Sequence, residues 1–306
     1  MEALQEIPKL PSYSRSELLR AGRFTPQPGL LPLGVNPRSG LWEFVHLETG
    51  AEPACGADGR VVRDAEGRLS LSAETGLVFI LVPGGKLPIE VPPPGQLVRQ
   101  DMDASAVELA PYFLSKYEMT QFQWDRCADD PYTIVHPNDA LLPAASLSWP
   151  AARATLSKLL GSPTLPSHVQ WELACRGGTT TYWWTGAEPA SLVGRENVRV
   201  QGEEAAPCRA IGTGEPNPFG FHDMHGNVWE WTHDALLADY ERPVLVHAEG
   251  DGVLDRPGAA FRKIAGGSHA YDADRARSSF TTAVTAGHAV GDLGLRPAMR
   301  IARAEH

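Results

Sequence analysis

A glutamate flanked by two tryptophans is the part of this 306-residue sequence whose residue types most clearly suggest chemistry. Trp229-Glu230-Trp231 follows directly on Gly226-Asn227, a pair that is typical of a turn. A carboxylate between two indole rings is expected to be partly buried, and a buried carboxylate needs a cation or several hydrogen-bond donors. The sequence therefore predicts that Glu230 has strong partners.

Calcium is one candidate partner. Asp223 and Glu230 lie on either side of the turn, so both could supply oxygen ligands to one hard cation. The carbonyl groups of Gly226 and Val228 lie between them in the chain. These four residues form the predicted Ca2+ site; the alternative is that an arginine or backbone N–H groups neutralise Glu230.

A histidine-based metal site is a second possibility. His222 and His225 are three residues apart on the expected turn, a spacing compatible with imidazole ligation, and His233 and His269 occur nearby in the sequence. Ten histidines are spread over the chain. The alternative is therefore that these four are surface or hydrogen-bonded side chains.

Composition and charge exclude some classes of function. The net charge of -10 argues against a nucleic-acid partner, because binding a phosphate backbone needs clustered Lys and Arg. No apolar run reaches the length of a membrane span, and the N-terminus lacks the basic and apolar regions of a signal peptide. These features predict a cytoplasmic protein with no membrane partner. Four scattered cysteines without a Cys-x-x-Cys spacing are then expected to be reduced: Cys55, Cys127, Cys175 and Cys208.

The elements that must position these residues are short. High Gly and Pro counts of 30 and 26 limit regular helix. Capping patterns and apolar spacing predict helices over 14–21, 120–127, 148–160 and 168–176, the last with Ser167 as N-cap, and a Pro-rich loop over 86–107. Alternating residues predict a half-buried strand over 41–47. Turns at 56–59 and 64–67 predict a small meander, so residues 1–74 are expected to form a short helix and strands packed on the main body.

Several segments carry a resemblance to one known family. They are Leu77–Gly85, Pro111–Gln121, Leu165–Gly178, Asn217–Asp234, Lys263–Ser268 and Gly294–Arg296. With these segments the sequence resembles the sulfatase-modifying-factor group, the formylglycine-generating-enzyme-like domain. The resemblance implies an α+β, C-type-lectin-like fold with little regular secondary structure over residues 75–306.

The resemblance also defines what is missing. Active family members oxidise a substrate cysteine with molecular oxygen, using a copper-binding pair of cysteines just after Gly-Gly-Ser; thiolates are the soft ligands that select Cu(I). By spacing, those two positions fall on Tyr271 and Ala276, and no cysteine follows Cys208. We therefore expect no copper and no formylglycine formation. Related members hold iron with three histidines, partly from an additional N-terminal helical domain that this sequence lacks.

The resemblance implies calcium as well. It places a structural Ca2+ on Asp223, Gly226, Val228 and Glu230, the same four residues that the local chemistry suggests. A second family site would begin at Asn197-Val198, but the following loop is shortened and offers only Glu203-Glu204. We do not expect calcium there.

The loop beginning at His269 is polar and aromatic and is expected on the face that carries the family's active site. Tyr, Arg and Ser are typical of recognition surfaces. The predicted binding face consists of Trp229, Ser268, His269, Tyr271, Asp272, Asp274, Arg275 and Arg277. The leading hypothesis is a catalytically silent module that binds a protein or peptide, in a signalling or defence system with a kinase or protease. The alternative is a non-haem metal-dependent oxidoreductase that uses a histidine-based site.

Overall fold

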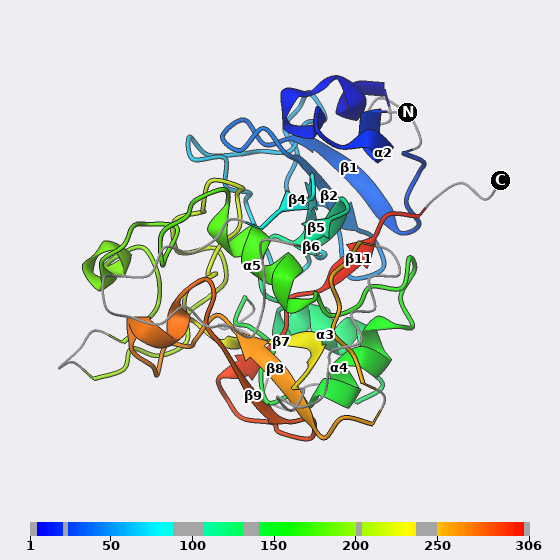
Figure 1. Cartoon of the computed structure of the whole chain (residues 1–306). Coiled ribbons are helices and arrows are strands. Elements are labelled where there is room, and N and C mark those ends of the chain that lie inside the picture. Colours follow the sequence, from blue (N-terminus) through cyan, green and yellow to red (C-terminus); the bar gives the residue numbers. More distant parts are fainter. Residues whose placement is uncertain are drawn as a thin grey trace.

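A five-stranded antiparallel sheet connects the N-terminal part of the chain to the rest of the computed structural model, which describes residues 5–20, 24–87, 107–130, 141–199, 204–236, 250–256 and 258–302. Its strand order is β1-β2-β3-β6-β11. The strands span Leu30–Val35, Trp42–His46, Val78–Val82, Tyr112–Ser115 and Ala298–Arg300. Strands β1 and β2 therefore belong to the same sheet as the family segments, and the C-terminal strand β11, red in Figure 1, pairs with β6.

A second sheet carries the tryptophan segment. Its order is β10-β7-β8-β9, with bounds Leu293–Gly294, Trp229–Ala235, Phe261–Ala265 and Thr281–Thr285. β10 pairs with β7 in parallel, and the other two pairs are antiparallel. A two-stranded ribbon of β4 (Gly85–Lys86) and β5 (Glu108–Leu109) completes the strands that the structure describes. Most of the predicted loop over 86–107 lies outside the described residues.

Helices are few and short, as the glycine and proline content predicts. The α-helices are α2 (Glu17–Arg20), α3 (Gln121–Cys127), α4 (Trp149–Leu156) and α5 (His168–Arg176); the 3-10 turns are η1 (Ile7–Lys9), η2 (Pro11–Tyr13), η5 (Pro189–Leu192) and η6 (Ala273–Ala276). Within the described ranges, none of these helices has the length and hydropathy needed to cross a bilayer. This mixture of short helices and strands is the α+β architecture that the sequence predicts.

Local capping explains which helix predictions succeed. Thr120 and Ser167 are the N-caps of α3 and α5, each in a complete capping box, and Gly177 with φ +55 is the C-cap of α5. The helix predicted over 148–160 ends at Leu156 because the chain turns after Ser157. The helix predicted over 14–21 is shorter and follows a 3-10 turn.

One strand differs from its prediction in burial. The alternation over 41–47 predicts a half-buried strand, but all five residues of β2 are buried. The polar positions have interior partners: Glu43 accepts from Lys116 and Arg63, and His46 Nε2 lies 2.9 Å from the carbonyl of Leu160. Alternation cannot reveal this arrangement, because the partners come from distant segments.

Tryptophans hold the two sheets and α5 together. Trp171, Trp183 and Trp231 are fully buried, and each indole N–H has an acceptor, on Glu230, Ala273 and Leu147 respectively. A buried indole contributes a large apolar area but needs a partner for its N–H group. These pairings fix the position of β7 and therefore of the residues around Glu230.

Candidate functional site

The turn before β7 can be made only by a glycine at position 226. Gly226 has φ +118, and a Cβ atom there would lie 2.2 Å from the carbonyl oxygen of Asn197. Asn227 follows with φ +57. Its Nδ2 group donates to Glu118, and its Oδ1 atom accepts from Asn197 and from the backbone N–H of Arg209. The turn thus joins three distant segments.

Glu230 is neutralised by an arginine. Its carboxylate accepts from Arg296 Nη2 at 2.8 Å and from the indole N–H of Trp171 at 2.6 Å. Glu230 and Arg296 are 1% and 0% exposed. Arg296 also donates to the carbonyl oxygens of Ser115 and His222, so the ion pair connects β7 to β6 and to the turn. This geometry matches the arginine alternative for Glu230.

Asp223 points to a different partner. It accepts from Arg209 Nη2 at 3.0 Å and from the N–H of Gly212 at 2.8 Å. The described residues contain no group of three or more His, Cys, Asp or Glu side chains that could hold a metal ion. Asp223 and Glu230 thus each have an arginine partner in this arrangement, and the calcium site on Asp223, Gly226, Val228 and Glu230 stays a prediction.

Two further buried carboxyl groups lie close to this cluster. Burial and the nearby Asp223 and Glu230 raise the pKa of Glu118 well above its usual range. Burial and Asp223 do the same for Glu196, whose Oε1 accepts from the indole of Trp184 and whose Oε2 has no partner. Both carboxyl groups are therefore expected to hold their protons to higher pH than an exposed glutamate does.

We expect Glu118→Gln to flatten the pH dependence of stability. A carboxyl whose folded pKa is raised stabilises the fold fully below its unfolded pKa of about 4.3, and this stabilisation is lost as pH rises toward the folded pKa. The variant should therefore gain stability relative to the parent at pH 8 and not at pH 4. Urea unfolding at both pH values measures this, with the exposed Glu188→Gln as control. An equal change at both pH values would contradict the raised pKa.

The four candidate histidines contact different parts of the chain. His225 contacts the carbonyl of Ala276 through Nδ1 and accepts from the N–H of Trp184 through Nε2, and burial lowers its pKa to about 3. His222 and His269 contact other carbonyls, those of Gly214 and Ala206. His233 lies beside Arg153. Each ring thus has its own local partner, and the histidine-metal hypothesis stays an untested alternative.

The cysteines offer no reactive thiolate near the turn. Cys175 Sγ lies 3.7 Å from the His225 ring, but burial raises the pKa of the thiol well above its usual range and lowers that of the imidazole. Burial also raises the pKa of Cys208 to about 12. All four cysteines are free. A neutral thiol beside a neutral imidazole lacks the thiolate that nucleophilic and metal chemistry require.

The predicted binding face has two buried residues, Trp229 and Ser268, and six that are at least partly exposed, which we call the rim. Ser268 donates to Asp292, and Trp229 packs against Tyr271 and Phe280 with ring centroids 5.7 and 6.1 Å apart. Tyr271 is 38% exposed, and the guanidinium of Arg275 lies 5.2 Å from its ring centroid. The rim is largely paired: Asp272 with Arg199, Asp274 with Arg277, and His269 with Ala206. Tyr271 and Arg275 are the exposed members best placed to contact a ligand.

The sequence reasoning misses the partners in this region. Arg296, Arg209 and Arg199 each neutralise a predicted site residue, and Glu118 and Glu196 are absent from the predicted set. Arg296 follows Gly294-Leu295, one of the segments that carry the family resemblance. Glu230 lies in another of these segments. The occurrence of one arginine and one buried glutamate in two family segments could have suggested that Arg296 and Glu230 form an ion pair.

The fold and the turn define a C-type-lectin-like domain of the formylglycine-generating type. PvdO from Pseudomonas aeruginosa superposes with a TM-score of 0.59 at 19% identity, covering 82% of this chain and all of that one. Treponema denticola variable protein 1 gives 0.54 at 19% identity, covering 74% and 96%. A family model described as the sulfatase-modifying factor enzyme 1-like domain matches residues 70–301. The chain belongs to this family.

Relatives that are similar in sequence include two named enzymes and a protein kinase. The formylglycine-generating enzyme of Bos taurus is 26% identical over 170 residues, which cover 50% of this chain and 41% of that protein. Hercynine oxygenase of Mycolicibacterium thermoresistibile is 32% identical over 128 residues, covering 38% and 27%. The serine/threonine-protein kinase pkn1 of Chlamydia caviae is 27% identical over 107 residues, covering 35% and 16%. The matches span less than half of each relative, so they identify a shared domain.

Proposed function

We propose that this chain is a catalytically silent member of its family that binds a protein or peptide on the loop 268–280. The observation that carries the proposal is the pair of residues at the expected thiolate positions: Tyr271 packs on Trp229 as a recognition aromatic, and Ala276 is buried. Neither side chain supplies the thiolate that selects Cu(I) or that could form a disulfide with a substrate thiol.

The chemistry of the loop suggests what it recognises. Arg275 lies on the Tyr271 ring without a hydrogen-bonded carboxylate in the described part of the chain. Aromatic and arginine side chains together are typical of interface hot spots. We infer that the partner is a peptide segment with an acidic residue next to an apolar one.

The kinase relative supports a regulatory setting. A domain of this family inside a serine/threonine kinase is consistent with a module that binds proteins in a signalling or defence assembly beside a kinase or protease. A histidine-based oxidoreductase is the second candidate, favoured by the name of the hercynine oxygenase relative. The separate partners of His222, His225, His233 and His269 disfavour it.

Peptide display tests the proposal. Peptides selected on the purified protein should lose at least about thirtyfold in affinity, or roughly 2 kcal/mol, on Tyr271→Ala and on Arg275→Glu. They should bind normally to Arg60→Glu, a change at an exposed residue in the N-terminal part of the chain. Selected peptides that bind all three variants equally would show that another surface is used, and failure to select any peptide would contradict the proposal.

A further inference from the structure

A cavity of about 350 Å³ lies between β11, α4 and the start of α5. We call it the β11 cavity; its polar lining includes Arg153, Thr164, Gln170, His233 and Arg300. It shares no residue with the loop 268–280, and its volume is within the range of small-molecule sites.

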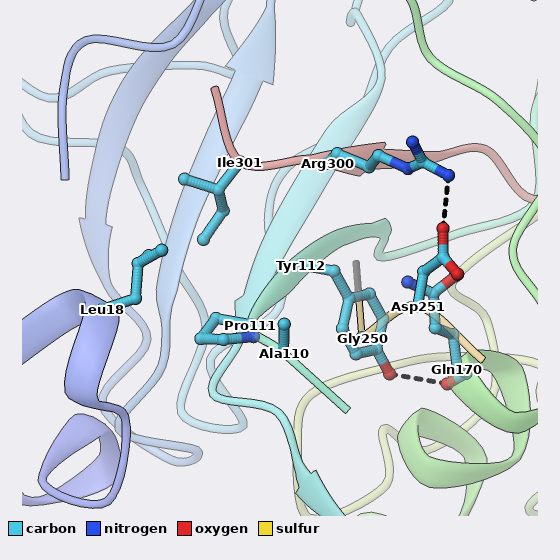
Figure 2. A pocket seen from close by; sticks show the side chains of 9 residues that line it. All are labelled: Leu18, Ala110, Pro111, Tyr112, Gln170, Gly250, Asp251, Arg300 and Ile301. Atoms are coloured by element: carbon cyan, nitrogen blue, oxygen red, sulfur yellow. Dashed lines mark hydrogen bonds and ion pairs between the residues drawn. The ribbon is translucent and has the colours of Figure 1, made fainter. Parts of the chain in front are cut away.

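On one wall of the cavity, the positive charge of Arg300 is balanced by the negative charge of Asp251. Arg300 and Asp251 form an ion pair, and both residues also line a much smaller neighbouring pocket of about 40 Å³. Figure 2 shows this pair, together with the hydrogen bond from the Tyr112 hydroxyl to the carbonyl of Gln170, 2.6 Å long. These contacts fix the wall between the two spaces and offset the charge of Arg300.

Arg153, on another wall, has no such direct ion pair in the described residues, although the nearby Asp255 partly offsets its charge. Its guanidinium lies 5.0 Å from the Trp149 ring centroid, and Nη1 is 2.8 Å from His233 Nε2. Burial and the nearby arginine lower the pKa of His233 to about 4, so its ring is neutral at physiological pH. Asp255 is ion-paired with Arg262 instead. Among the described residues, the hydrogen bonds of the Arg153 guanidinium go to the His233 ring, through Nη1.

Two neutral donors line the same space. Thr164 Oγ1 is buried without a hydrogen-bond partner. Gln170 accepts from the N–H of Ser167 through its Oε1 atom, and its Nε2 group has no hydrogen bond among the residues that the structure describes. A buried hydroxyl without a partner is costly unless a ligand or water satisfies it. Apolar side chains complete the lining: Leu165, Val253, Ala298 and Met299.

We propose that the β11 cavity binds a small organic carboxylate with an apolar body, with Arg153 as the carboxylate partner and Thr164 and Gln170 as donors. An arginine presents paired N–H groups that match a carboxylate. The apolar lining accommodates a short hydrocarbon chain. This site is separate from the peptide face, so either proposal can fail without the other.

Calorimetric titration with hexanoate and with its neutral counterpart hexanamide tests this site. We expect hexanoate to bind at least about tenfold more tightly than hexanamide, because only the acid can pair with Arg153. Arg153→Gln should abolish that preference. Thr164→Val keeps the side-chain shape and should weaken hexanoate binding several-fold while leaving the melting temperature equal or higher, because it removes an unsatisfied hydroxyl. The exposed Arg60→Gln serves as the control and should bind as the parent does.

Three results would overturn the proposal. They are equal affinity for hexanoate and hexanamide, retention of the preference in a folded Arg153→Gln variant, and absence of binding by hexanoate. Circular dichroism of each variant establishes that it is folded. If Arg153→Gln does not fold, Thr164→Val decides the outcome alone, and unchanged hexanoate affinity in that variant overturns the assignment.

Discussion

Replacing Arg296 by methionine is expected to destabilise the fold by about 3–5 kcal/mol. The change leaves the 1%-exposed Glu230 without its cation and with the Trp171 indole as its remaining hydrogen-bond donor. It also frees the carbonyl oxygens of Ser115 and His222, which accept from Arg296. Urea unfolding monitored by tryptophan fluorescence measures the loss.

A double variant separates the charge from the packing. Glu230→Gln combined with Arg296→Met removes both charges, so it should recover a substantial part of the stability lost in Arg296→Met alone. Arg195→Met is the surface control, because Arg195 and its partner Glu215 are 44% and 43% exposed and the change should cost less than about 1 kcal/mol. A loss below 1 kcal/mol in Arg296→Met would show that Glu230 is not held by this pair.

The second large effect concerns the connection between the N-terminal strands and the family domain. Lys116, in the segment after β6, donates to Glu43 on β2 at 2.8 Å, and both side chains are essentially inaccessible to solvent. Burial opposes the charge on Glu43, but Lys116 and Arg63 together hold the pKa of its carboxyl below the usual range. Lys116→Met should therefore destabilise the protein by roughly 3 kcal/mol, somewhat less than Arg296→Met because Arg63 remains.

Proteolysis shows where this second loss acts. If the pair joins β2 to the domain, limited digestion of Lys116→Met should cut the first 74 residues faster than in the parent protein. Glu43→Gln with Lys116→Met should reverse much of the effect, since no unpaired charge is left. Unchanged stability and cleavage in Lys116→Met would contradict a structural role for this pair.

Local features of the fold could be predicted from the sequence because their causes are local. Thr120 and Ser167 begin helices because each is followed three residues later by a glutamine that completes a capping box. The family resemblance adds the topology, which capping and alternation do not specify. Glu43 on β2 can be buried because Lys116 and Arg63, which are distant in the chain, donate to its carboxylate. The alternation of residues in β2 does not reveal these partners and therefore predicts an exposed position.

The candidate site was predictable in its residues but not in their partners. A glutamate between tryptophans indicates a buried carboxylate, but the sequence favours calcium over arginine as its partner. Arg296 lies 66 residues away, and only the parallel pairing of β10 with β7 brings its segment beside Glu230. The same holds for His222 and His225. Their spacing allows metal ligation, but it does not reveal that their Nδ1 atoms contact the backbone carbonyls of Gly214 and Ala276.

Oxidation of a cysteine-containing peptide tests the central claim most directly. The protein, in a preparation that binds its selected peptide, is incubated with the cysteine peptide, oxygen and either Cu(I) or Fe(II). Mass spectrometry follows aldehyde and sulfoxide formation, and a formylglycine-generating enzyme serves as the positive control. We predict no product above the protein-free reaction, because Tyr271 and Ala276 supply no thiolate and the four histidines are separately bonded. Repeated turnover with either metal would contradict the account and identify this chain as an oxidase.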